Sequence, residues 1–324
     1  MTKKTVIILN RPKGARLANQ LWNFISVYAY CLEKGYECKN YSFFEDKKQE
    51  SKPNSIRTYY NLFDMPGSRM IRFLLWLHVY LSKISQKPRL YYRYVEYIKR
   101  TCPGHIIYSP EPEVFNLPPT GNNDKQQMTR LLEEENNTSK KIYLDGWLFR
   151  NPVGIEKYRK EIIEYFKPTH TIIEHVRDLI APLQKKYKKL VGVHIRQGDY
   201  KKLFANGKYY FNEEEVRQIL DGYLVFTNSK NEDVIFLICS DEKTDTSYFL
   251  GLNYIVAKGN EAEDLFTLAS CDIIIGSRST YGPWAALYGN IPFIMFEKTI
   301  DWSYYRQKDM SKYFNNEKCG LATG

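Results

Sequence analysis

The chain has 324 residues, which is long enough for two domains of roughly 100–200 residues each. Its composition, 43% apolar and 26% charged, is typical of a globular protein and excludes a disordered chain. The net charge of +10 is unevenly distributed, because residues 1–100 carry 19 basic and 7 acidic residues, and the other 224 carry 28 and 30. A basic N-terminal third indicates an anionic partner: a membrane surface, a nucleic acid or a phosphorylated substrate.

The sequence lacks the signals of secretion, membrane insertion and structural metal binding. Residues 1–9 have no apolar core of a signal peptide, and the best apolar candidate, Met70–Leu81, is interrupted by Arg72 and His78. The six cysteines include no C-x-x-C pair, so we interpret them as reduced and mostly buried thiols. We therefore expect a soluble cytoplasmic protein without a structural metal, and peripheral association with a membrane stays open.

The first elements in chain order are a strand, a loop and a helix. Thr5–Asn10 is a short apolar run, Arg11–Arg16 is a loop, and Leu17–Leu32 has a helical apolar period that ends at Gly35. Tyr36–Phe44 is the next predicted strand. This order resembles the opening of an α/β nucleotide-type domain.

Residues 47–130 are basic and rich in Tyr, and they allow two interpretations. Within them, Met70–Ile84 is apolar and flanked by Arg and Lys. It is predicted either as a helix lying on an anionic membrane or as an internal helix whose basic side chains reach the surface. The polar stretch 121–139 is predicted to be exposed.

From Lys141 onward, predicted strands and helices alternate. The strands are Ile142–Leu144, Leu190–Ile195, Val234–Cys239, Ile273–Ile275 and Ile291–Phe296. The helices are Ile155–Phe166, Thr171–Ala181, Glu213–Leu224, Ala262–Ala269 and Tyr281–Tyr288. This alternation predicts a mostly parallel α/β sheet over residues 186–300, and the lysine-rich stretch Pro182–Lys189 is predicted to be an interdomain linker.

Polar side chains follow three of the C-terminal strands. They are His194, Arg196 and Asp199 at the first, Ser240 and Asp241 at the second, and Ser277, Arg278, Ser279 and Thr280 at the third. Because ligands of an open parallel α/β sheet bind beyond the carboxyl ends of its strands, these residues are expected to meet at one site.

Arg196 and the pair Ser279-Thr280 each allow a functional and a structural interpretation. The Arg196 guanidinium suits phosphate oxygens and a leaving diphosphate, and Gly198 permits the turn that brings Asp199 back to the site. The same H-x-R-x-G-D pattern also fits a structural Arg–Asp pair. The two hydroxyls suit either capping of the next helix or phosphate binding at its N-terminus.

Two common nucleotide-binding patterns do not occur in the sequence. It contains no D-x-D triplet, whose carboxylates hold a divalent ion on the diphosphate in many nucleotide-sugar enzymes. It also contains no G-x-x-x-x-G-K-[ST] loop, which argues against P-loop chemistry. Arginine and hydroxyl residues at the strand ends therefore favour diphosphate binding without a metal.

Four stretches match the motifs of one known family in the same order. They are Gly14–Trp22 (GARLANQLW) with G-x-L-G-N-Q-[LM]-F, Tyr143–Trp147 (YLDGW) with L-[ED]-G-[YW], Val191–Tyr200 (VGVHIRQGDY) with H-x-R-x-G-D, and Asp264–Trp284 with D-L-x-x-M-x-x-C-x-x-x-I-x-x-N-S-[ST]-F-S-W-W. On these motifs the chain resembles the α-1,2-fucosyltransferases of glycosyltransferase family 11, within the wider α-1,2/α-1,6/protein-O-fucosyltransferase superfamily. Three positions depart from the family pattern: Ala18 replaces a glycine, Arg278 replaces an asparagine, and Gly282-Pro283 replace Ser-Trp.

The resemblance implies a GT-B architecture, an α/β fold in which two Rossmann-like domains face a cleft. We expect an acceptor-binding α/β domain over residues 1–185, a GDP-sugar-binding domain over 186–300, and a C-terminal segment, 301–324, that packs back on the first domain. The implied reaction is inverting transfer of L-fucose from GDP-fucose to a glycan hydroxyl, galactose O2 in an α-1,2 linkage, without a metal or other cofactor.

The roles that the resemblance implies fall on specific residues. Arg196 would bind the β-phosphate and stabilise GDP as it leaves. The inverting step needs a base on the acceptor hydroxyl, for which Asp199 is the first candidate and Asp145 the second, although Asp199 would alternatively orient Arg196. The further donor-binding candidates are His194, Asn19, Gln20, Ser240, Asp241, Asp264, Ser279 and Thr280. The acceptor-binding candidates are Asp145 and Trp147.

The expected setting is synthesis of O-antigen, capsule or a related surface polysaccharide. The basic N-terminal third would dock a cytoplasmic enzyme on the anionic inner leaflet, where lipid-linked acceptors lie. One alternative keeps the fold and uses another GDP-linked hexose. A different class, a non-enzymatic protein that binds nucleic acid or a membrane surface, would use the same basic charge and Tyr rings. Because no nucleic-acid-binding motif accompanies the charge, nucleic acid is not expected as a partner.

Overall fold

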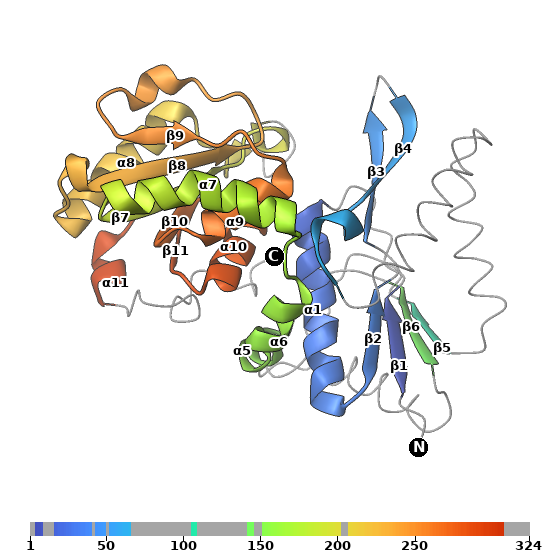
Figure 1. Ribbon diagram of the computed structural model, residues 1–324. Coiled ribbons are helices and arrows are strands. Elements are labelled where there is room, and N and C mark those ends of the chain that lie inside the picture. The colour runs from blue at the N-terminus through green and yellow to red at the C-terminus, as the bar shows by residue number, and fades with distance from the viewer. Residues whose placement is uncertain are drawn as a thin grey trace. The chain divides into compact units, whose positions relative to one another are not determined.

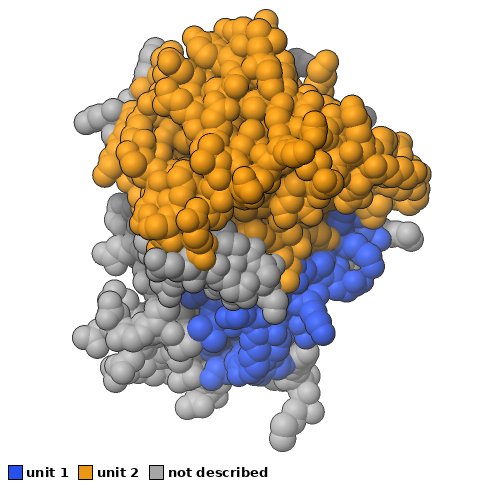
Figure 2. Space-filling model, turned by 90° about the vertical axis from the view of Figure 1, so that its left-hand side faces the viewer, with its two compact units in different colours: residues 1–169, 322–324 blue, residues 170–321 orange. Residues whose placement is uncertain are grey.

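The computed structural model describes residues 4–8, 16–40, 43–49, 52–65, 105–108, 141–145, 151–201 and 207–307. The chain forms two compact units, residues 1–169 with 322–324 and residues 170–321, which Figure 2 shows in blue and orange. The division falls between Thr169 and His170, and not at the expected 185/186. Helix α7 (His170–Lys186) explains this difference, because it runs through Pro182 and packs on the second unit's strand β7 and helix α9. The stretch Pro182–Lys189 is therefore helix end and strand start, and not a linker.

The first unit contains a parallel sheet with the strand order β2-β1-β6-β5. Its strands are β1 (Thr5–Ile8), β2 (Glu37–Asn40), β5 (His105–Tyr108) and β6 (Lys141–Asp145). Helix α1 (Leu17–Lys34) connects β1 to β2, which confirms the predicted strand, loop and helix. The helix ends at Gly35, whose φ of 67° lets the amides of Gly35 and Tyr36 bond to carbonyls in the last turn.

Helix α1 is buried along most of its length and packs against two short helices, α5 (Pro152–Lys157) and α6 (Arg159–Tyr165) (Figure 1). The sequence predicted one helix there, and the structure has two that meet at Tyr158. An antiparallel hairpin of β3 (Phe44–Gln49) and β4 (Lys52–Thr58), followed by a 3₁₀ turn at Tyr60–Leu62, was not predicted.

The second unit contains a five-stranded parallel sheet with the order β11-β10-β7-β8-β9. Its strands are β7 (Lys189–Ile195), β8 (Val234–Ser240), β9 (Tyr254–Val256), β10 (Ile273–Gly276) and β11 (Phe293–Met295). Helices α7, α9 (Glu261–Ala269) and α10 (Tyr281–Gly289) pack on one face of the sheet, and α8 (Glu213–Thr227) and α11 (Trp302–Gln307) pack on the other. The predicted alternation of strands and helices is confirmed, and the short edge strand β9 was missed.

Strand β7 is buried on both faces, and successive side chains point to opposite sides. Val191, Val193 and Ile195 join the core beneath α8. His194 points to the other face, where its ring centroid lies 4.9 Å from that of Tyr281. A Cβ at Gly192 would lie 2.8 Å from the Leu268 side chain of α9, so glycine lets this helix lie close to the strand.

Some expectations fall on residues outside the described ranges. Met70–Ile84 is one of them, so neither interpretation of it is tested. Of the expected C-terminal segment, residues 301–307 are described, and Trp302 stacks on Phe226 of α8 within the second unit. No helix among the described residues is long and apolar enough to cross a membrane. In the same ranges, Cys31, Cys239 and Cys271 are buried free cysteines and Cys38 is half-buried.

Candidate functional site

The carboxyl ends of β7, β8 and β10 lie side by side in the second unit (Figure 1). The register pairs Ile195 of β7 with Ser240 of β8, and His194 of β7 with Gly276 of β10. The residues that follow these strands, Arg196, Asp241 and Ser277, therefore start at one edge of the sheet. This is the convergence that the sequence predicted.

Arg196 is held between two carboxylates. Its Nε and Nη2 atoms donate to Asp199 Oδ1 at 2.9 and 2.6 Å, and its Nη1 lies 3.0 Å from Asp241 Oδ2. The side chains of Arg196 and Asp241 are 14% and 18% exposed, whereas that of Asp199 is 42% exposed. The guanidinium is thus fixed in direction and still reachable from one side. Both the Arg–Asp pair and the cluster at the strand ends occur, so the two interpretations of the motif are compatible.

Backbone contacts tie the Arg196 loop to the neighbouring strand ends. The Arg196 amide donates to Ser277 Oγ at 2.8 Å, and the Gln197 amide donates to Asp241 Oδ1 at 2.8 Å. Ser277 is completely buried, and its amide donates to the His194 carbonyl at 2.9 Å. A Cβ at Gly198 would lie 2.9 Å from Asp241 Oδ2, so a side chain there would push on the carboxylate that holds Arg196.

Two tyrosines that the sequence reasoning missed take part in this edge. Tyr200, in the 3₁₀ turn Asp199–Lys201, is buried, donates its hydroxyl to the Arg278 carbonyl at 2.6 Å, and lies 5.7 Å beneath the Arg196 guanidinium. Tyr209 accepts a bond from Arg278 Nη1 at 3.0 Å, and the guanidinium lies 4.8 Å from its ring centroid. The spacing of Tyr200, one residue after the H-x-R-x-G-D motif, was the available signal for it.

His194 is buried on the face of the sheet covered by α10. Burial is the main cause that lowers the pKa of its imidazole to about 4; the positive charge of Arg196 acts in the same direction, and the negative charge of Asp241 opposes it. The imidazole is therefore neutral at pH 7. Its Nδ1 atom is buried and forms no hydrogen bond with any described group. A neutral ring with an unused nitrogen can bond to a ligand but contributes no charge.

Asp264 lies in the first turns of α9, close to the same buried region. Its Oδ1 accepts a hydrogen bond from the Gly259 amide at 3.1 Å. A Cβ on residue 259 would lie 2.7 Å from that oxygen, so a glycine fits at this position and a larger residue would collide with the carboxylate. Burial raises the pKa of the Asp264 carboxyl to about 6, and the Gly259 bond opposes this rise. The hydroxyl of Tyr281 donates to the Glu261 carbonyl at 2.6 Å and so joins α10 to the start of α9.

The hydroxyl residues at the edge have local backbone partners. Ser279 Oγ accepts the Tyr281 amide at 3.2 Å, and Ser240 Oγ accepts the Glu242 amide at 3.3 Å. Thr280 is the residue before α10, and its side chain does not cap the helix. Of the predicted pair, Ser279 thus makes the bond to the helix start, and Thr280 lies beside it.

The candidates from the first unit share one edge of the other parallel sheet. Asn19 and Gln20 lie in the first turn of α1, and Asp145 is the last residue of β6, whose neighbour β1 leads into that helix. Trp147 lies outside the described residues. Contact of these residues with a donor or an acceptor stays a prediction.

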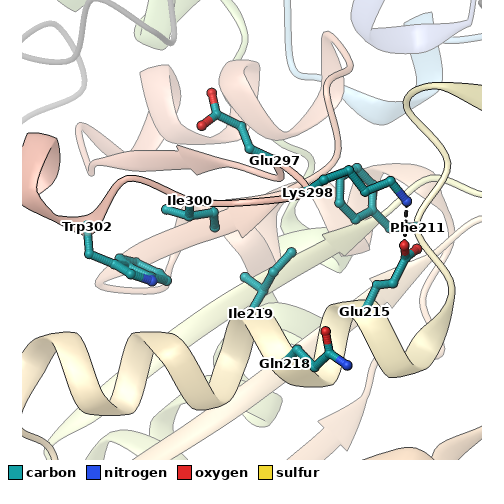
Figure 3. Close-up of a pocket in the computed structure, with 8 residues that line it drawn as sticks. All are labelled: Phe211, Glu215, Gln218, Ile219, Glu297, Lys298, Ile300 and Trp302. Carbon is teal, nitrogen blue, oxygen red and sulfur yellow. Dashed lines mark hydrogen bonds and ion pairs between the residues drawn. The ribbon is translucent and has the colours of Figure 1, made fainter.

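A separate hollow lies against α8, and none of the predicted site residues lines it (Figure 3). It is lined by Phe211, Glu215, Gln218, Ile219, Glu297, Lys298, Ile300 and Trp302. Lys298 crosses it to pair with Glu215 and also donates to the Tyr210 carbonyl at 3.1 Å. Lys298 and Glu215 neutralise each other, and the predicted chemistry-bearing residues lie at the strand ends, so we assign the candidate site there. In the part of the chain that the structure describes, no three His, Cys, Asp or Glu side chains form a metal-binding group.

Two α/β units with parallel sheets define a GT-B-type protein, and the second unit presents a fixed arginine beside a helix start at its strand ends. The family described as Glycosyl transferase family 11 matches residues 156–316. Over this region the chain matches glycosyl transferase family 11, which confirms the family resemblance predicted from the motifs.

Solved fucosyltransferase structures have a similar fold at low sequence identity. POFUT1 in complex with GDP-fucose has a TM-score of 0.54 and 13% identity, with 90% of this chain and 98% of that chain covered. Fucosyltransferase NodZ from Bradyrhizobium has a TM-score of 0.51 and 16% identity, with 92% and 96% covered. NodZ α-1,6-fucosyltransferase co-crystallised with GDP has a TM-score of 0.51 and 15% identity, again with 92% and 96% covered. These likenesses confirm the fold class. No curated protein sequence matches the chain.

Proposed function

We propose that this glycosyltransferase moves L-fucose from GDP-fucose to a hydroxyl group of a glycan, with inversion at the anomeric carbon and without a metal ion. The observation that carries the proposal is the Arg196 guanidinium, fixed by Asp199 and Asp241 at the carboxyl end of β7. The match to family 11 supports glycosyl transfer, and similar folds have been crystallised with GDP and GDP-fucose.

The reaction separates charge at the diphosphate, which is the step Arg196 is suited to assist. The acceptor oxygen forms a bond to the anomeric carbon of fucose, while the bond from that carbon to the β-phosphate oxygen breaks. GDP leaves with an additional negative charge, and the acceptor proton goes to a base. A guanidinium already fixed in direction stabilises the developing charge without reorganising first.

Asp199 is best suited to orient Arg196. Its Oδ1 accepts two charge-assisted bonds from the guanidinium, and these bonds fix the direction of the arginine. We therefore propose Asp145, at the end of β6, as the base. Asp145→Asn should lower kcat by about 10²–10⁴-fold with little change in GDP affinity, whereas Asp199→Asn should change both. Equal losses in the two variants would contradict this division of roles.

The other candidates form the donor pocket in this proposal. His194 offers a neutral nitrogen, and Asp241 and Asp264 offer acceptor oxygens to guanine, ribose or fucose. Ser240, Ser279 and Thr280 offer hydroxyls to phosphate oxygens beside the start of α10. Asn19 and Gln20 reach the sugar, and Trp147 contacts the acceptor.

The proposed acceptor is a galactose whose O2 receives fucose in an α-1,2 linkage, within a surface polysaccharide such as O-antigen or capsule. The basic residues of the N-terminal third support a lipid-linked acceptor on the cytoplasmic face of a membrane. The linkage is tested by incubating the enzyme and GDP-fucose with galactosides blocked at single hydroxyls. Product from the O2-blocked galactoside would contradict the α-1,2 assignment.

The donor is tested by calorimetric titration of GDP-fucose, GDP-mannose and UDP-glucose with EDTA present. Arg196→Ala should weaken GDP-fucose about 10–100-fold, because it removes charge-assisted bonds to phosphate. Arg177→Ala is the matched control, since Arg177 is exposed on α7 and pairs with Glu174 and Asp178. Preference for GDP-mannose would favour transfer of another GDP-linked hexose. Absence of binding to any GDP compound would overturn the proposal.

A further inference from the structure

The amino ends of the second unit's strands form an edge of the sheet opposite the candidate site. Helix α7 ends at Lys186 and β7 begins at Lys189, so lysines are concentrated at this turn. The Lys188 amide donates to the Asp233 carbonyl at 2.9 Å, which places the loop between α8 and β8 beside the turn. That loop carries a further lysine. We call this group the lysine edge, and it consists of Lys185, Lys186, Lys188, Lys189 and Lys230.

The charges of the lysine edge are only weakly paired. Lys188 lies 3.0 Å from Asp233 and Lys230 lies 3.8 Å from Glu232, and the two lysine side chains are 79% and 78% exposed. Exposed ion pairs of this kind contribute little free energy, so an anionic partner can compete for these lysines. In the described part of the chain, the other three lysines form no ion pair with a carboxylate, and Lys186 lies over the Tyr187 ring.

The two most exposed large apolar side chains among the described residues lie next to the lysine edge. Val225, in the last turn of α8, is 82% exposed, and Leu250, in the loop before β9, is 70% exposed. Asn231 donates to the Gly251 carbonyl at 2.7 Å, so the lysine-bearing loop after α8 contacts the loop that carries Leu250. Arg217 of α8 donates to the Leu250 carbonyl at 2.7 Å and ties the helix to the same loop. Cations and aliphatic side chains thus share one surface.

This combination fits a lipid bilayer with anionic headgroups. Lysine is a compact charge that is attracted to headgroup phosphates without a fixed geometry. Aliphatic side chains gain free energy when they enter the apolar boundary beneath the headgroups, and a nucleic acid offers Val225 and Leu250 no such environment. Stabilisation of the α7 dipole explains only Lys185 and Lys186, because the other three lysines lie outside the helix.

We propose that the lysine edge, together with Val225 and Leu250, is a surface by which the second unit docks on an anionic lipid bilayer. This surface is distinct from the basic N-terminal third of the sequence, and the proposal does not depend on which sugar nucleotide binds. Strand β7 has seven residues and so spans about 20 Å. Docking at its amino end therefore leaves Arg196, at its other end, open to a ligand.

The test is sedimentation of the full-length protein with vesicles of phosphatidylcholine, with and without phosphatidylglycerol. Wild type should bind the anionic vesicles only, and less as salt rises. Because each lysine near an anionic surface contributes about fivefold, combining four substitutions should weaken binding about 100-fold or more. They are Lys185→Gln, Lys186→Gln, Lys188→Gln and Lys189→Gln. The matched control removes four exposed lysines elsewhere and should bind nearly as wild type does: Lys157→Gln, Lys160→Gln, Lys167→Gln and Lys258→Gln.

A second variant tests the apolar part and keeps every charge. Val225→Asn with Leu250→Asn should weaken binding to anionic vesicles about tenfold, and the binding that remains should be more sensitive to salt. Val153→Asn with Ile173→Asn is its control, since these two side chains are also exposed, at 46% and 42%, and lie on α5 and α7. Thermal unfolding of each variant verifies that it is folded.

Three results would overturn the proposal. They are absence of wild-type binding to anionic vesicles, equal losses in the lysine-edge variant and its control, and binding of an oligonucleotide in place of vesicles. Titration of GDP-fucose separates this proposal from the proposed function. If vesicles bind as expected and no GDP compound does, the docking surface stands and the transferase assignment fails. If GDP-fucose binds and the lysine-edge variant still binds vesicles like wild type, the transferase assignment stands and the docking surface fails.

Discussion

Two groups of ionisable residues in the second unit differ in which protonation state their surroundings favour. The cluster beyond β7 and β8 keeps its charges, because Arg196 is paired with Asp199 and Asp241 and remains partly exposed. Beneath α9 and α10, burial favours the neutral forms, which lowers the pKa of His194 to about 4 and raises that of Asp264 to about 6. The second unit thus offers fixed charge in one place and, in another, a neutral imidazole beside a carboxyl whose pKa lies near 6.

This difference suits the two chemical parts of a sugar nucleotide. A diphosphate requires cations, and a cation fixed by carboxylates is already oriented when the ligand arrives. A base, a ribose or a sugar requires hydrogen bonds, for which buried neutral groups avoid the cost of desolvating a charge. The predictions below test whether the two groups differ in this way.

The largest effect is expected from Arg196→Lys. Lysine keeps the positive charge but cannot bond to Asp199, Asp241 and a phosphate in one planar arrangement, so kcat should fall about 10²–10³-fold. The measurement is steady-state kinetics with GDP-fucose, with Arg177→Lys as the control. Activity within a few fold of wild type would mean that charge alone suffices and that the carboxylates do not orient a catalytic group.

Ser277→Ala tests whether the hydrogen bond from the Arg196 amide to Ser277 stabilises the loop that carries the charged cluster. The Arg196 amide donates to Oγ of the completely buried Ser277, so the variant leaves that amide without its acceptor. The free energy of unfolding should fall by about 1–3 kcal/mol, measured by urea denaturation. Ser303→Ala, whose exposed hydroxyl bonds to Asp301, is the matched control and should change stability little. An equal effect in both variants would show that the Arg196 loop does not depend on β10.

His194→Gln tests the buried neutral imidazole. The unfolded imidazole has its ordinary pKa near 6.5, and the folded one binds a proton only near pH 4. Between these values the unfolded state takes up a proton that the folded state does not, so wild type should lose stability as the pH falls from 6.5 to 4. Thermal unfolding of both proteins across this range measures the effect. A parallel pH dependence in the variant would contradict burial of a neutral imidazole.

Much of this edge could be predicted from the sequence, because it depends on local patterns. The apolar runs of β7, β8 and β10 are clear, and each is followed at once by polar residues. The parallel alternation then places those residues at one edge. The C-terminal end of α1 was equally clear, because a glycine follows the apolar period, and Gly35 adopts the positive φ that such a helix end requires.

The rest depends on contacts between distant residues. Nothing in the sequence pairs Arg196 with Asp241 or places Ser277 under the Arg196 amide, because these contacts follow from strand register. Pro182 and the lysines after it suggested a linker, but packing of α7 on β7 keeps the helix intact. The break at Tyr158 was likewise invisible, since the apolar period continues across it.

Asp264→Asn is expected to have the smallest effect of these variants, and it distinguishes a role of Asp264 in stability from a role in donor binding. The folded carboxyl retains its proton up to about pH 6, whereas the unfolded one releases it near 3.8. Wild type should therefore lose stability relative to the variant as the pH rises from 4 to 6, which is opposite to the effect at His194. Asparagine still accepts the Gly259 amide, so the variant should be at least as stable as wild type at pH 7.5.

If Asp264 also accepts hydrogen bonds from the donor, the same variant should bind GDP-fucose more weakly at pH 7.5. Titration of GDP-fucose into both proteins decides this: unchanged affinity in a stabilised variant would remove Asp264 from the donor pocket and leave it a purely structural carboxyl.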